Sequence, residues 1–254
     1  MRVVRGEYAS GLGYDFIKPE REGAPLLFFI HGGGWMGGDR SMFAEEAAWF
    51  AEQGYATALI SYRFSPAHTF PDQVLDVRNF VRHVVRESSS LGFDPAKVVA
   101  FGNSSDGHLA LMLACADDSL PGDELPPPGV RGCVSLAGIS DLTDESKSYP
   151  EISEQFVPLF MGGNYHGNEE RYAAASPIKY LERQKPEAAF LLIHGDQDEI
   201  VPVSQSRTMA DALKGAGAEV VYEELPGEHH AYSMSGMNRI RQLTLQFMQR
   251  LFPS

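Results

Sequence analysis

Three segments of this 254-residue chain carry side chains whose types and order suit nucleophilic catalysis by a serine. Residues 98–114 (VVAFGNSSDGHLALMLA) place Ser104 between a short apolar run and an apolar helical pattern, which predicts a strand–turn–helix corner. Further along, residues 194–202 offer carboxylates and residues 227–232 offer two histidines. A serine hydroxyl becomes a useful nucleophile when an imidazole takes its proton and a carboxylate orients that imidazole. The chain order serine, acid, histidine fits a nucleophile at such a corner.

A fourth segment could stabilise the negative charge that such a reaction develops. Residues 31–35 (HGGGW) follow a continuous apolar run, and glycines without Cβ atoms leave the backbone free to close on a substrate oxygen. A tetrahedral intermediate needs preorganised N–H donors, each worth about 3 kcal/mol in the barrier. The backbone amide that follows the nucleophile, here that of Ser105, is the other expected donor.

The elements that must position these segments alternate between strands and helices. Strands are predicted at residues 2–9, 14–18, 26–30, 55–62, 97–101, 130–137, 189–194 and 219–225. Helices are predicted at residues 41–53, 71–91, 204–215 and 235–251, besides the one that follows Ser104. This alternation is typical of an α/β fold with a mostly parallel sheet of about eight strands and helices on both faces. Because the chain shows no repeat and no linker, we expect one domain over residues 1–254, with its site at the carboxyl ends of the strands.

Residues 141–181 interrupt this alternation. The segment is too long for an ordinary connection, and its hydrophobic periodicity is weak. Long connections inside compact domains are usually lids or binding loops, so we predict that this insertion lines or covers the site. The alternative is a pair of surface helices that only covers a sheet edge.

Composition argues against several other classes of function. The net charge of −13 disfavours nucleic acid or an anionic membrane as partner, because phosphate binding needs clustered Lys and Arg. No apolar stretch approaches the roughly 18–20 residues that span a membrane, and the N-terminus has no apolar signal region. Two cysteines, Cys115 and Cys133, make no disulfide framework, so we expect both in the core of a cytoplasmic protein. No metal-ligand spacing occurs, so neither metal nor cofactor is expected, and a homodimer is left open.

The same segments together resemble the α/β-hydrolase esterases of the hormone-sensitive-lipase-like and feruloyl-esterase-like groups. The resemblance covers nearly the whole chain. It rests on HGGGW (31–35), YRFSPAHTFP (62–71), DPAKVVAFGNSSDGHLA (94–110), HGDQDEIVP (194–202) and GEHHAY (227–232). The chain lacks the long N-terminal cap of many hormone-sensitive-lipase-like members, so it looks closer to compact esterases and arylformamidase-like enzymes.

This resemblance implies a carboxylesterase that works through an acyl-enzyme intermediate. The implied catalytic triad is Ser104 as nucleophile, Asp198 as acid and His230 as base. The implied oxyanion hole consists of Gly33, Gly34 and Ser105. The compact insertion favours short to medium acyl or aryl esters, a small-molecule substrate, over long lipid chains. The apolar side chains expected to contact this substrate are Trp35, Phe156, Phe160, Met161 and Tyr165.

The serine segment departs from the G-x-S-x-G pattern, because Asp106 stands where the second glycine is expected. An Asp there must find space and a hydrogen-bond partner, but its charge suits the first turn of a helix, so we expect a tolerated variation. A shifted frame would make Ser105 the nucleophile. That frame puts Asn103 where the turn needs a residue without a side chain, so the sequence favours Ser104.

The acid and the base each have a neighbouring rival. His229 and His230 are adjacent, and only one can face the nucleophile; the spacing from Gly227 favours His230. Asp196 is the rival of Asp198, and we expect Asp196 to order its own loop instead. The substrate class also has alternatives, since an arylformamidase or another amidase would use the same triad. A binding module would keep the fold without the chemistry, although an intact triad argues against it.

Overall fold

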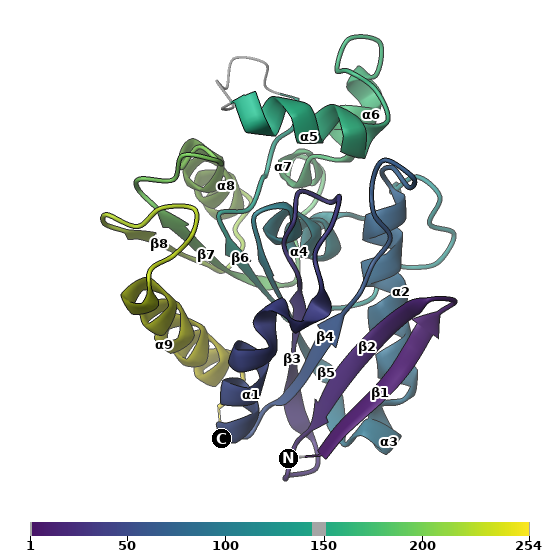
Figure 1. Ribbon diagram of the computed structural model, residues 1–254, viewed down its shortest axis with the longest axis vertical. Helices are drawn as coiled ribbons and strands as arrows, with labels where there is room; N and C mark the ends of the chain where they lie inside the picture. Colours follow the sequence, from purple (N-terminus) through teal and green to yellow (C-terminus); the bar gives the residue numbers. More distant parts are fainter. Residues whose placement is uncertain (1, 144–150, 254) are drawn as a thin grey trace.

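A mostly parallel sheet runs through the protein in the computed structural model, which describes residues 2–143 and 151–253 (Figure 1). Its strands are β1 (Arg2–Ala9), β2 (Leu12–Lys18), β3 (Ala24–Ile30), β4 (Ala56–Ile60), β5 (Phe93–Asn103), β6 (Gly132–Leu136), β7 (Ala189–Gly195) and β8 (Val220–Leu225). Their order is β1-β2-β4-β3-β5-β6-β7-β8. The β1–β2 and β2–β4 pairs are antiparallel, and every pair from β4 to β8 is parallel. The predicted α/β architecture is confirmed.

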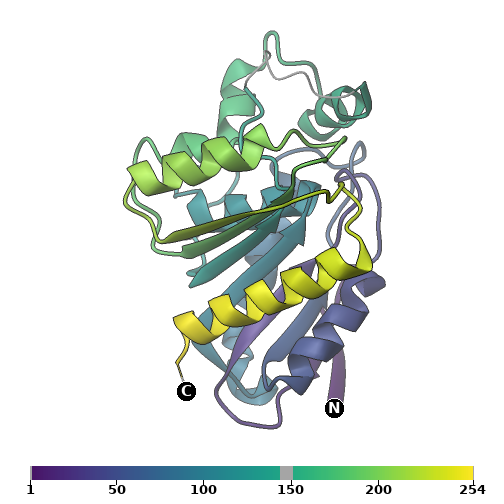
Figure 2. The ribbon, with the colours of Figure 1, turned by 90° about the vertical axis from the view of Figure 1, so that its left-hand side faces the viewer.

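Helices cover both faces of this sheet. On one face lie α1 (Ala44–Glu52) and α9 (Met234–Leu251), and on the other lie α2 (Asp72–Arg86), α4 (Ser105–Cys115) and α8 (Ser204–Gly215) (Figures 1 and 2). Alternate side chains of a strand therefore enter opposite cores. On β3, Phe28 packs in the core under α2 and α4, and Phe29 packs in the core under α1 and α9. Burial on both faces explains why the parallel strands are continuous apolar runs in the sequence.

The carboxyl ends of the parallel strands bring the four chemistry-bearing segments to one edge of the sheet. Strand β3 is followed by residues 31–35, β5 by Ser104, β7 by the loop that carries Asp198, and β8 by the loop that carries His230. In open α/β sheets this edge is where ligands bind. The topology thus gathers residues that are far apart in the sequence.

The structure differs from the predicted elements mainly at helix ends. The helix predicted at 71–91 is divided at Glu87 into α2 and α3 (Ser88–Leu91). The helix predicted at 41–53 begins as the 3-10 turn η1 (Arg40–Phe43), whose Asp39 side chain accepts a hydrogen bond from Ser41 N–H. Such capping contacts set where helices begin and end, and hydrophobic periodicity does not report them.

The insertion contains three helices that its weak periodicity did not reveal. They are α5 (Glu151–Met161), α6 (Glu169–Ala174) and α7 (Pro177–Tyr180). Figure 1 places α5 and α6 at the top of the molecule, above α4 and the loop that follows β3. Residues 144–150, which belong to the predicted insertion, lie outside the described residues. In the part of the chain that is described, no helix combines the length and the apolar character needed to cross a membrane.

Candidate active site

Ser104 lies at a sharp turn between β5 and α4. Its φ of 61° and ψ of −123° are a conformation that non-glycine residues rarely adopt, and its N–H donates to Leu136 O at 2.8 Å. Gly102 permits this turn, because a Cβ there would be 2.1 Å from Asp106 O. Gly107 lets α4 approach β6, since a Cβ there would be 2.9 Å from Leu136 O. This is the strained geometry of a nucleophile elbow.

The two adjacent serines have different surroundings. The Ser104 side chain is partly exposed. Ser105 is 1% exposed, and its hydroxyl donates to Asp106 Oδ2 at 3.0 Å. Ser105 also begins α4, so its backbone N–H is one of the helix N-terminal groups that have no acceptor within the helix. The geometry favours Ser104 as nucleophile and suits the Ser105 amide as an oxyanion donor.

A carboxylate and two imidazoles meet beyond the ends of β7 and β8. His230 Nδ1 donates to Asp198 Oδ2 at 2.8 Å, and His194 Nε2 is 3.1 Å from the same oxygen. The other carboxylate oxygen accepts the N–H groups of Ile200 and Val201, each at 2.8 Å. Burial alone would raise the pKa of the Asp198 carboxyl, but the hydrogen bonds from His194 and His230 hold it well below its ordinary value. An ionised Asp198 therefore orients His230 and leaves its Nε2 free to take a proton.

His194 has a structural role that the sequence did not indicate. Its side chain is fully buried, its Nδ1 accepts from Ser206 Oγ at 2.8 Å, and its Nε2 is also 3.0 Å from Val201 O. The imidazole therefore fixes the Asp198 carboxylate to helix α8, which carries Ser206. The sequence feature that could have indicated this role is the position of His194 at the start of the HGDQDEIVP segment, four residues before Asp198.

The rival acid and the rival base have other partners. Asp196 Oδ1 accepts the N–H of Gly227 at 2.7 Å, which orders the two loops against each other. The exposed His229 pairs with Glu199 at 3.2 Å. Only His230 of the two histidines contacts Asp198.

Within residues 2–143 and 151–253, Ser104 Oγ has no hydrogen-bond partner, so the contact between Ser104 and His230 stays a prediction.

The loop after β3 has a backbone that requires glycine. Gly33 has a φ of 139° and Gly34 a φ of 62°, values that favour glycine. A Cβ at Gly33 would lie 2.2 Å from Gly37 O, because the loop folds back on itself. A Cβ at Gly34 would lie 3.2 Å from Cδ1 of Phe156 on α5. The insertion thus lies directly on the predicted oxyanion loop.

Trp35 anchors the end of this loop through a buried histidine. Its indole stacks on Phe160 with ring centroids 4.3 Å apart, and its Nε1 donates to His108 Nδ1 at 3.3 Å. His108 Nε2 in turn donates to Ala175 O at 2.7 Å. Burial lowers the pKa of His108 to about 4, so the imidazole is neutral and can accept and donate at once. His108 thereby joins the oxyanion loop, α4 and the insertion, a role the sequence analysis missed.

The predicted substrate contacts divide into two groups. Trp35, Phe160 and Met161 are at most 1% exposed and belong to the hydrophobic core. Phe156 and Tyr165 are partly exposed. The buried three are therefore suited to support a binding surface from behind, and Phe156 is the one that lies against the oxyanion loop. Their contact with substrate stays a prediction.

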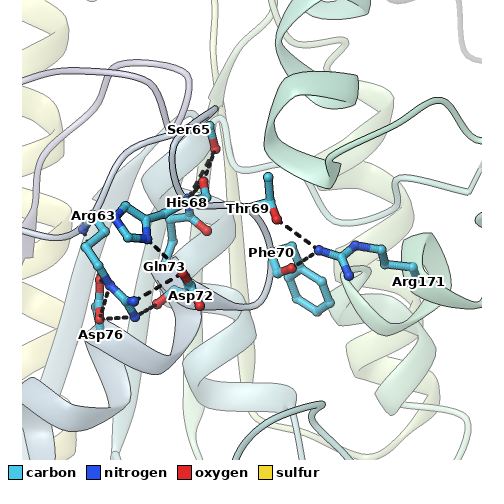
Figure 3. A network of polar contacts seen from close by, with 9 residues as sticks. All are labelled: Arg63, Ser65, His68, Thr69, Phe70, Asp72, Gln73, Asp76 and Arg171. Atoms are coloured by element: carbon cyan, nitrogen blue, oxygen red, sulfur yellow. Dashed lines mark hydrogen bonds and ion pairs between the residues drawn. The ribbon is translucent and has the colours of Figure 1, made fainter.

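A polar network ties the insertion to the loop that precedes α2 (Figure 3). Arg171 of α6 donates to Thr69 Oγ1 at 3.1 Å and to the backbone carbonyl of Phe70. The same loop is held from its other side, where the Arg63 guanidinium pairs with Asp76 at 2.7 Å. The insertion is therefore attached to the sheet domain by charge-assisted hydrogen bonds as well as by apolar packing.

Replacing Arg171 with methionine is expected to loosen the insertion. The change keeps an apolar stem but removes the donors to the loop, and hydrogen bonds to charged groups are worth about 1.5–3 kcal/mol. We expect a lower free energy of unfolding and faster cleavage within the insertion during limited proteolysis. Arg239→Met, on the exposed side of α9, is the matched control. Equal cleavage rates in the two variants would contradict the anchoring role.

The nucleophile elbow, the Asp198–His230 pair and the sheet topology define a protein of the α/β-hydrolase fold. Residues 15–213 match the model of the BD-FAE family, and the chain belongs to that family. The resemblance inferred from the sequence motifs is confirmed. Among solved structures, the fold matches that of Thermogutta terrifontis esterase 2 phosphonylated by sarin, with a TM-score of 0.84. That match covers 98% of this chain and 95% of the other at 21% identity, which speaks for the fold alone.

Curated relatives carry esterase names. The chain is 32% identical to Esterase LipQ of Mycobacterium tuberculosis over 89% of its own length, and 31% identical to the probable carboxylic ester hydrolase LipM of the same organism over 98%. It is 26% identical to the isoprenylcysteine alpha-carbonyl methylesterase ICME of Arabidopsis thaliana over 81%. The chain spans 54%, 60% and 50% of the lengths of these three proteins.

Proposed function

We propose that the protein is a serine hydrolase of carboxylic esters. The observation that carries this proposal is the 2.8 Å hydrogen bond from His230 to the buried Asp198, at the sheet edge where Ser104 occupies its elbow. In the proposed reaction His230 takes the Ser104 proton while the serine oxygen attacks the ester carbonyl carbon. The carbon–oxygen bond to the alcohol then breaks, and the alcohol leaves with the proton from His230. Water deprotonated by His230 then attacks the acyl carbon, the bond between that carbon and Ser104 Oγ breaks, and His230 returns the proton to the serine as the acid is released.

The backbone amides of Gly33, Gly34 and Ser105 are proposed to stabilise the oxyanion of each tetrahedral intermediate. Ser105 is at the N-terminus of α4, where the helix dipole also favours negative charge. The loop that carries Gly33 and Gly34 is held from above by Phe156 and from its end by Trp35. Donors fixed in this way need no reorganisation when the charge develops.

Short to medium acyl or aryl esters are the proposed substrates. The contact of Phe156 with the oxyanion loop limits the room above that loop, which supports small acyl groups. The esterase and ester hydrolase names of the relatives support an ester over an amide.

A substrate series tests this function. The purified chain is expected to hydrolyse p-nitrophenyl acetate and butyrate much faster than p-nitrophenyl palmitate. Butyryl p-nitroanilide, with the same acyl group on an amide nitrogen, is expected to react far more slowly. Faster turnover of the anilide would favour an amidase instead. Turnover of no substrate in the series would favour a binding module that has the fold without the chemistry.

A further inference from the structure

A buried carboxyl that the proposed reaction does not use lies beside the nucleophile. Asp106, the residue that departs from the glycine pattern, is 0% exposed. Its Oδ2 accepts the Ser105 hydroxyl at 3.0 Å, and within the described residues its Oδ1 has no hydrogen-bond partner. The structure therefore finds space for this side chain, but with fewer partners than a buried carboxylate needs.

Tyr62, in the loop after β4, is the other polar neighbour of this carboxyl. The Tyr62 side chain is buried, and its ring stacks on His31 with centroids 4.7 Å apart. The Tyr62 hydroxyl is 3.4 Å from His31 O and also faces the Asp106 carboxyl. A phenol has one hydrogen, so it can donate fully to only one of two acceptors. Because a carboxylate is the stronger acceptor, a charged Asp106 would draw this hydrogen away from the His31 carbonyl.

Among the described residues, the groups around Asp106 offer no compensating positive charge. Its neighbours in the described residues are the Ser105 hydroxyl and the Asp106 backbone N–H on α4, the Tyr62 hydroxyl, and Gly32 after β3. Burial raises the pKa of the Asp106 carboxyl well above its ordinary value and likewise raises that of the Tyr62 phenol. An ionised carboxylate in such surroundings, without a cation, costs several kcal/mol. The sequence suggested that the N-terminal dipole of α4 would stabilise a negative charge on Asp106. That stabilisation does not outweigh the cost of burying the charge.

We propose that Asp106 is a neutral carboxylic acid that acts as a positioning residue, leaving the Tyr62 hydrogen to the His31 carbonyl while holding the Ser105 hydroxyl. His31 lies two residues before Gly33, the first of the two oxyanion glycines, and Ser105 carries the amide proposed to act with them. The neutral acid thus connects the loop after β3 with the start of α4, the two segments that carry the proposed oxyanion donors. The positioning role rests on the proposed function, but the neutrality of the carboxyl does not.

The neutrality is tested by unfolding, independently of any activity. Wild type, Asp106→Asn and the control Asp118→Asn, an exposed position, are unfolded in guanidinium chloride between about pH 5 and 8. An unfolded Asp has a pKa of about 3.9, so in this range the unfolded wild type has lost a proton that the folded protein keeps. Stability therefore falls as pH rises. The unfolding constant of the wild type relative to Asp106→Asn is expected to rise up to about tenfold per pH unit until the folded carboxyl ionises.

A ratio of the wild-type to the Asp106→Asn unfolding constant that does not change with pH, or that changes no more than the ratio to Asp118→Asn, would overturn the neutral acid. Asp106→Gly also lacks the carboxyl, so the ratio of the wild-type to the Asp106→Gly unfolding constant is expected to change with pH in the same way. It matches the glycine pattern that the sequence leads one to expect, so it serves where Asp106→Asn fails to fold.

The positioning role is tested on p-nitrophenyl acetate. Asp106→Gly removes the partner of Ser105 and Tyr62, and we expect kcat to fall by roughly tenfold or more while KM changes little. Asp106→Asn is neutral and of the same shape, so it is expected to restore most of kcat. Equal losses in the two variants, or no loss in Asp106→Gly, would overturn the positioning role. A chain with no esterase activity would remove the proposed function, and the unfolding result would still decide the state of Asp106.

Discussion

Ser104→Ala is expected to lower kcat for p-nitrophenyl butyrate by roughly 10⁶-fold, the loss that follows removal of the nucleophile from a serine triad. The side chain can be truncated with little effect on folding, because within the described residues its hydroxyl has no hydrogen-bond partner. The backbone conformation of the elbow is held by its N–H bond to Leu136 O and by the close approach at Gly102, both of which survive the change. Steady-state kinetics and circular dichroism of the purified variant measure the two effects.

Ser105→Ala is the matched control for this change. It removes the hydroxyl bonded to Asp106 but keeps the backbone N–H, so its loss of kcat is expected to be smaller by orders of magnitude. A fluorophosphonate probe is expected to label the wild type and Ser105→Ala at Ser104 and to leave Ser104→Ala unlabelled. Labelling of Ser104→Ala together with retained hydrolysis would instead identify Ser105 as the nucleophile.

The sheet and its edge could be predicted from the sequence because the signals are local. Each buried strand is a continuous apolar run, and the alternation with helices leaves parallel pairing as the simplest arrangement. Since the carboxyl ends of parallel strands share an edge, the convergence of residues 31–35 with the elbow and the two loops follows from order alone. The choice of His230 over His229 also depended on local spacing, and in the structure the His230 imidazole is hydrogen-bonded to Asp198.

Contacts between distant elements could not be predicted in this way. Nothing in the sequence near His194 shows that Ser206, on the next helix, will bind its other nitrogen. The position of Asp106 in the first turn of a helix suggested a charged side chain, yet Tyr62 and the oxyanion loop close over it. Burial of a polar side chain is a property of the packed whole, so sequence patterns at one position do not reveal it.

Asp198→Asn is expected to reduce kcat by roughly 10⁴-fold, because the residue would no longer hold the His230 tautomer whose Nε2 can accept a proton. The carboxylate accepts hydrogen bonds at both oxygens, from two imidazoles and two backbone N–H groups. An amide has only one acceptor oxygen, so its NH₂ group must face a donor on one side. Asp196→Asn is the control in the same loop, and a larger loss there than in Asp198→Asn would reassign the acid.

The difference in unfolding free energy between the wild type and Asp198→Asn is expected to decrease as the pH falls. The pKa of the folded Asp198 carboxyl is held below its ordinary value, so ionisation stabilises the fold above the unfolded pKa of about 3.9. That contribution is lost as pH falls below this value. The advantage in unfolding free energy of the wild type over Asp198→Asn is therefore expected to be constant near neutrality and to shrink in acid. An advantage that persists undiminished at pH ~2 would show that the carboxylate is not held by its histidines, and the triad geometry would lose its electrostatic basis.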